Sequence, residues 1–168
     1  METNMQNQTE YHPLDGPKGL GGWLVLIQIG LFLTLLMLAV QILQSTIPSL
    51  KPDIWGLLTA KDSELYHVLW GPIIIFEAIA NVGQFLFCLF VLGMFYSKKS
   101  SVPLLMIIFY GGSMIIGIID YALVQQIPIV QELEDGSSVS DIGRSVVTCA
   151  IWIPYFLKSR RVRNTFVQ

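Results

Sequence analysis

The sequence predicts an all-α integral membrane protein, in which four transmembrane helices form an antiparallel bundle and both termini are cytoplasmic. Two observations predict this fold class. The chain has 168 residues, of which 53% are hydrophobic and only 13% are charged, whereas an average soluble domain carries about 25% charged residues. The apolar residues are also gathered into long blocks, and a transmembrane helix needs about 20 mainly apolar residues in succession.

The apolar blocks divide the chain into a polar cytoplasmic tail at 1–18 and a transmembrane domain at 19–168. The predicted spans cover about 20–43, 68–96, 102–124 and 142–157. We expect the first span to remain as an anchor, because its apolar run is too long for a signal peptide and no A-x-A cleavage site follows. The fourth is the shortest and begins close to Arg144, but the basic stretch after it is a good stop signal.

The Lys and Arg residues beside the spans predict the orientation, because cytoplasmic loops are enriched in these cations. One side of the predicted bundle holds most of them: Lys18, Lys98, Lys99, Lys158, Arg160, Arg161 and Arg163. The other side holds Lys51 and Lys61. Four crossings return the chain to its starting side, so both termini are expected in the cytoplasm. The short turn at 97–101 predicts that the second and third spans form an antiparallel hairpin.

Ionisable side chains inside the spans are the candidate functional residues, because a charge at the centre of a membrane helix costs roughly 2.5–3.5 kcal/mol on insertion scales. The second span contains Glu77, Asn81 and Gln84, and their i, i+4, i+7 spacing places them on one helix face. This face favours one of two structures. It either forms hydrogen bonds between helices, or it lines a polar path for a proton, an ion or a small ligand.

Asp120 and Arg144 lie toward the outer ends of the third and fourth spans, at similar depth and with opposite charge. We predict an ion pair between them, because pairing lowers the cost of both charges in a membrane. A pair between Arg144 and Glu77 is the main alternative, and solvation of both charges at the outer surface is another. Glu77 is the deepest of the three charges, so any functional centre within the bilayer is predicted on its helix face, for which a structural role is the favoured interpretation.

Other sequence features do not assemble into a catalytic or metal site. The histidines His12 and His67 are far apart, and the cysteines Cys88 and Cys149 fall at different predicted depths with no metal-binding spacing. We therefore expect no enzyme activity, no cofactor, no metal and no nucleic-acid partner. The expected partners are the lipid bilayer and either another membrane protein or further copies of the chain.

Two end motifs resemble a known family. Gly19-Leu-Gly-Gly-Trp-Leu24 opens the first span, and Trp152-Ile-Pro-Tyr-Phe156 with Ser159-Arg-Arg-Val-Arg-Asn-Thr-Phe166 closes the fourth. Together they resemble the YdgK-like family of small bacterial inner-membrane proteins, a domain-of-unknown-function family. The resemblance implies a multi-pass protein of the bacterial inner (cytoplasmic) membrane but supplies no activity. The motif positions it implies are Gly21, Gly22, Trp23, Pro154, Tyr155, Arg161 and Phe166.

The function predicted from these features is an accessory or assembly role in the inner membrane, without enzymatic activity. The prediction rests on the small size of the chain and on the lack of a catalytic constellation in its sequence. The alternative is a small ion- or proton-coupled transporter with a polar path on the second span.

Overall fold

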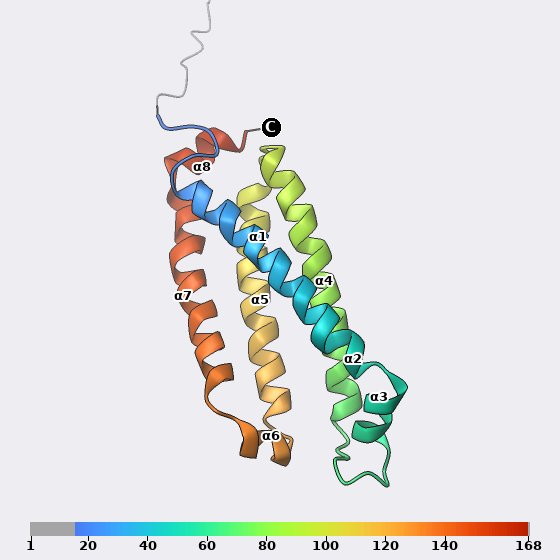
Figure 1. Cartoon of the computed structure of the whole chain (residues 1–168). Coiled ribbons are helices and arrows are strands. Elements are labelled where there is room, and N and C mark those ends of the chain that lie inside the picture. The colour runs from blue at the N-terminus through green and yellow to red at the C-terminus, as the bar shows by residue number, and fades with distance from the viewer. Residues whose placement is uncertain (1–15, 168) are drawn as a thin grey trace, which may run out of the picture.

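The computed structural model describes residues 16–167, so most of the polar tail predicted at 1–18 lies outside the described residues. Between residues 16 and 167 the regular structure is helical, without a strand. Four long helices follow one another along the chain: α1 (Trp23–Gln41), α4 (Trp70–Tyr96), α5 (Val102–Val124) and α7 (Ser137–Lys158) (Figure 1). The short helices are η1 (Ile42–Thr46), α2 (Ile47–Ser49), α3 (Pro52–Thr59), α6 (Pro128–Leu133) and α8 (Arg160–Thr165).

The described helices include three that are long and apolar enough to cross a membrane, where the sequence predicted four. These three cover Trp23–Ser49, Trp70–Tyr96 and Val102–Val124. Helix α7 is 22 residues long and packs along α5, but its first half carries many polar side chains. These are Ser137, Ser138, Ser140, Asp141, Arg144 and Ser145. The polar first half of α7 is the reason that its composition does not qualify it as a span.

The first helix continues beyond the predicted end at residue 43, because α1 passes through the π-helical turn η1 into α2 and ends at Ser49. A π-helical turn holds an extra residue and therefore changes the direction in which its side chains point. Here the buried Thr46 faces α4, where the Nδ2 of Asn81 donates a hydrogen bond to the Oγ1 of Thr46 at 3.1 Å. This bond joins the second half of the first helix to α4.

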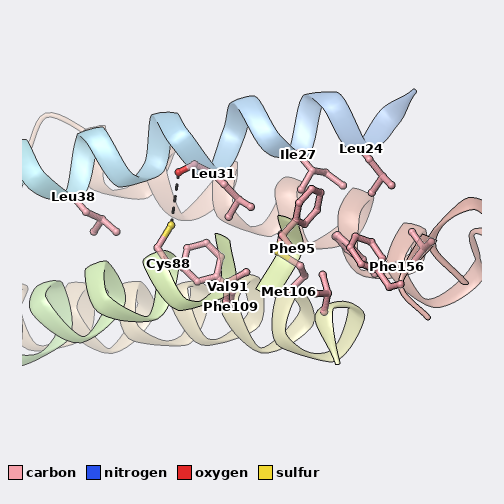
Figure 2. Packing of buried hydrophobic residues seen from close by; sticks show 13 residues of the cluster. Leu24, Ile27, Leu31, Leu38, Cys88, Val91, Phe95, Met106, Phe109 and Phe156 are labelled. Carbon is pink, nitrogen blue, oxygen red and sulfur yellow. Dashed lines mark hydrogen bonds between the residues drawn. The ribbon is translucent and has the colours of Figure 1, made fainter. Parts of the chain in front are cut away.

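Neighbouring long helices are antiparallel and pack in chain order, α1 against α4, α4 against α5 and α5 against α7. The described chain begins and ends at the same end of the bundle (Figure 1). Toward this end lies much of the apolar core, in which Leu24, Ile27 and Leu31 of α1 meet Phe95 of α4 and Phe156 of α7 (Figure 2). The core therefore fixes the helices together most firmly near the two termini.

The turn between α4 and α5 is closed by Lys98, which adopts a left-handed conformation with φ 51°. The Lys98 N–H donates to the carbonyl of Phe95 at 3.1 Å, and the Lys99 N–H donates to the carbonyl of Met94 at 3.2 Å. These bonds satisfy carbonyl groups at the end of α4, as in a Schellman cap. A side chain in this conformation is strained, because its Cβ approaches the following carbonyl oxygen.

Candidate functional site

Glu77 of α4 and Asp120 of α5 meet between the two helices. Their carboxyl groups lie within hydrogen-bonding reach of each other, and both side chains are half-buried. The Oδ1 atom of Asp120 is buried and has no hydrogen-bond partner among residues 16–167. A carboxyl group donates a hydrogen bond only when it is protonated. The geometry therefore describes a pair of acids that can share one proton.

The predicted ion pair between Asp120 and Arg144 is not formed in the structure. The Nη1 of Arg144 instead contacts the Oδ1 of Asp141 at 2.8 Å, and both side chains are exposed. Asp141 lies three residues before Arg144 on α7, so the two share a helix face without any rearrangement. This local partner also replaces the alternative pair between Arg144 and Glu77.

A polar cavity of about 330 Å³ lies between the second half of α5 and the first half of α7. Asp120 lines this cavity and also reaches Glu77, so its carboxyl group connects the cavity with α4. The other polar lining residues are Ser113, Tyr121, Ser138, Asp141 and Ser145. Carboxyl and hydroxyl oxygens together can coordinate a small cation or accept hydrogen bonds from water.

The three polar residues predicted on one face of α4 have three different surroundings. Glu77 meets Asp120, Asn81 donates to Thr46, and Gln84 lines a separate groove between α4 and α5. The face of α4 that carries Glu77, Asn81 and Gln84 is wide enough for the three side chains to contact different parts of the structure. The three residues therefore do not line one continuous polar path in the described structure. Glu77 and Gln84 belong to two separate sites, and Asn81 forms a structural hydrogen bond.

The groove that contains Gln84 has a volume of about 410 Å³ and lies between α4 and α5. Its large apolar residues are Phe76, Ile79, Phe87, Ile108, Phe109 and Ile116. Small residues interrupt them, including Gly83 of α4 and Gly112 of α5. Gln84 and Ser113 are its polar residues. Sequence reasoning missed this groove, although Gly112 and Ser113 stand together in the apolar run of α5.

The family model described as "Protein of unknown function (DUF2569)" matches residues 17–167. The chain belongs to this family. It is also similar to "Inner membrane protein YdgK" of Escherichia coli (strain K12), with 25% identity over 151 residues that make up 90% of this chain and 95% of that protein. No solved structure matches the chain.

Membership in DUF2569 confirms the resemblance predicted from the two end motifs. Together with the three candidate spans, it identifies the chain as a multi-pass protein of the inner membrane. The family description gives no activity.

The two end motifs of this DUF2569 protein meet at the end of the bundle that holds both termini. The Gly19 N–H donates a hydrogen bond to the Oγ1 of Thr165. The guanidinium group of Arg161 lies against Gly22, where an added Cβ would be 3.3 Å from the Arg161 Cζ. Gly22 has φ 61° and caps the start of α1. The Phe166 ring packs against Phe95, with 5.2 Å between ring centroids. We call Gly19, Gly22, Arg161, Thr165 and Phe166 the terminal clasp.

The remaining motif positions extend the terminal clasp along α7. Trp23 packs edge-to-face against Trp152 at 6.2 Å between ring centroids, and Tyr155 packs against the same Trp152 ring at 5.8 Å. Pro154 lies inside α7, one residue before Tyr155. Thr165 was not singled out from the sequence, although it lies inside the second end motif. These contacts give the family motif a structural role in joining α1 to α7 and α8.

Proposed function

We propose that this DUF2569 protein is a non-enzymatic accessory or assembly subunit of the inner membrane, which acts by packing against another transmembrane helix. The observation that carries this proposal is the groove between α4 and α5. It combines small residues with two polar side chains, Gln84 and Ser113, neither of which is hydrogen-bonded to another group in residues 16–167. A groove of this composition is typical of a helix-binding surface in a membrane.

A protein helix suits this groove better than a lipid tail does. Small residues allow two helix backbones to approach closely, which increases van der Waals contact. Polar side chains can form hydrogen bonds across the interface, worth about 0.6 kcal/mol each on average. A lipid tail has no hydrogen-bonding group and would leave Gln84 and Ser113 without partners.

Purification from native membranes in a mild detergent tests the assembly role. We expect the tagged protein to elute above its monomer mass, in complex with a membrane protein or with further copies of the chain. Replacing Gly83 by leucine fills the groove and should shift the protein toward the monomer. If the protein with the natural sequence elutes alone as a monomer, the assembly role is contradicted.

A second candidate function is a small ion- or proton-coupled transporter, and the contact between Glu77 and Asp120 favours it. The two acids lie beside a polar cavity, so a proton or a small cation reaching the cavity could bind at Asp120. This location moves the polar path from the face of α4 to the junction of α4, α5 and α7.

Flux measured in reconstituted vesicles distinguishes this transporter from an assembly subunit. We expect the Glu77→Gln and Asp120→Asn variants each to reduce a proton-driven flux, because neither amide can exchange the proton. An unchanged flux in both variants would remove the two carboxyl groups from the mechanism.

A further inference from the structure

We infer that the groove between α4 and α5 binds the α4 helix of a second copy of this chain, so that two copies form a symmetric dimer. This inference rests on the proposed assembly role and names the partner. A two-fold interface uses the same surface on both copies, so each copy must offer both a groove and a ridge that fills it. The described residues of α4 and α5 supply both.

The glycines of the groove face open space. A Cβ added at Gly83 or at Gly112 would meet no atom within 4 Å, apart from its own chain neighbours and helix backbone. Packing within one copy therefore does not require glycine at either position. Because the two glycines lie on adjacent helices and line the same groove, a helix seated there can approach both backbones closely.

The polar groups of the groove in one copy can form hydrogen bonds with the same groups of a second copy. Gln84 carries a carbonyl acceptor and two N–H donors, so the side chains of two copies can bond to each other across a two-fold axis. Gln84 lies 14 residues after the first residue of α4, and Ser113 lies 11 residues after the first residue of α5. Both are thus near the middle of their helices, where lipid offers no hydrogen-bond partner. A second copy brings a matching pair by symmetry.

Exposed apolar residues of α4 form a ridge along the edge of the groove, and Ile79 belongs both to this ridge and to the groove wall. Ile79 is 69% exposed and Leu86 is 59% exposed, although both belong to the same helix as Gly83. Ile79 precedes Gly83 by four residues, so the two lie on the same helix face. This ridge can enter the groove of the partner while the groove beside it receives the partner's ridge.

Disulfide cross-linking of the full chain in native membranes tests the dimer. Cys88 and Cys149 are replaced by alanine, and a single cysteine is introduced by Ile79→Cys at the ridge. We expect oxidation to produce a cross-linked homodimer. The control is Met37→Cys on α1, which is 67% exposed but lies on another helix, and it should not cross-link.

A matched pair of substitutions on α4 tests whether the groove itself is the interface. In the Ile79→Cys background, Gly83→Leu should reduce the cross-linked fraction roughly tenfold, because the added side chain fills the groove. Gly93→Leu also has no neighbour within 4 Å and is outside the groove, so it should leave cross-linking unchanged. Equal cross-linking in the two variants would overturn the inference.

The identity of the cross-linked product separates this inference from the proposed assembly role. A homodimer, identified by mass spectrometry, supports both. If the Ile79→Cys variant cross-links to a different membrane protein instead, the dimer is overturned but the assembly role is supported. If no cross-link forms and the chain elutes as a monomer in mild detergent, both are overturned.

Discussion

The hydroxyl group of Thr165 forms hydrogen bonds with both the N–H and the carbonyl of Gly19, although 146 positions separate the two residues in the chain. The Gly19 N–H donates to the Thr165 Oγ1 at 2.9 Å, and the Thr165 hydroxyl donates to the Gly19 carbonyl at 3.3 Å. Thr165 is only 3% exposed, so water cannot readily replace either bond. This contact fixes the segment before α1 against α8.

Replacement of Thr165 by valine should destabilise the protein by about 1–3 kcal/mol, because it leaves the half-buried backbone groups of Gly19 without a partner at nearly constant side-chain shape. Thermal unfolding in detergent micelles measures the effect. Thr165→Ser keeps the hydroxyl and should lose less stability than Thr165→Val. If the serine variant is the less stable of the two, the hydrogen bonds do not explain the role of Thr165.

Replacement of Gly22 by alanine should also destabilise the protein, by about 1–3 kcal/mol. Gly22 has φ 61° and ψ −138°, a conformation that strains any residue with a Cβ, and the added methyl group would press on Arg161. Gly30→Ala is the control, because Gly30 lies inside α1 with no neighbour within 4 Å. That variant should be neutral or more stable by up to about 1 kcal/mol. Similar unfolding temperatures for the two variants would contradict the strain at Gly22.

Replacement of Lys98 by glycine should stabilise the hairpin of α4 and α5 by about 1 kcal/mol, because glycine adopts a positive φ without strain. Lys99→Gly is the matched control, since it removes the same charge from the same turn without relieving a positive φ. Unfolding of both variants in detergent compares them. A Lys98→Gly variant that is no more stable than Lys99→Gly would show that the turn is not strained at Lys98.

Substitutions of Glu77 test its contact with Asp120 apart from any transport. Glu77→Gln keeps a hydrogen-bond donor and should change stability little. Glu77→Leu takes the polar neighbour away from the half-buried carboxyl group of Asp120 and should cost about 1–3 kcal/mol. Unfolding in detergent is again the measurement. If leucine and glutamine are equally well tolerated, the contact between Glu77 and Asp120 does not stabilise the fold.

Acidification should loosen the start of α7 through Asp135, which lies outside the spans. Hydrogen bonds from the hydroxyl and then the backbone N–H of Ser137 hold the pKa of Asp135 below its usual value. A lowered pKa in the folded state stabilises the fold above the ordinary pKa of about 4, and this stabilisation is lost as the pH falls through the lowered value. Amide hydrogen exchange at Ser137 should show the loss, and Asp135→Ala should remove that pH dependence.

The sequence predicted the helices better than it predicted their contacts. Long apolar runs define α4 and α5 almost to the residue, because a membrane helix needs an unbroken apolar surface. The first helix exceeded its predicted end through the π-helical turn at Ile42–Thr46, which no apolar pattern marks. The polar first half of α7 weakened the prediction of a fourth span, and the helix forms there in contact with α5.

The candidate site was predicted only in part, because spacing places residues on a face of one helix and does not say which helix that face meets. Glu77 was correctly placed inside an apolar helix, but its neighbour is Asp120, which had been assigned to Arg144 on the basis of depth and charge. The rotation of α5 turns Asp120 toward α4, and Arg144 has the nearer Asp141. Charge and depth alone therefore could not identify the pair.

The terminal clasp has a consequence for the biosynthesis of this protein. Gly19 leaves the ribosome long before Thr165, so the bond between them can form only when the rest of the chain has been made. Until then the early glycine segment and the first inserted helix lack a partner from the end of the chain. The terminal clasp therefore cannot form in a chain that stops before α8, and its two hydrogen bonds couple the start of α1 to the synthesis of α8.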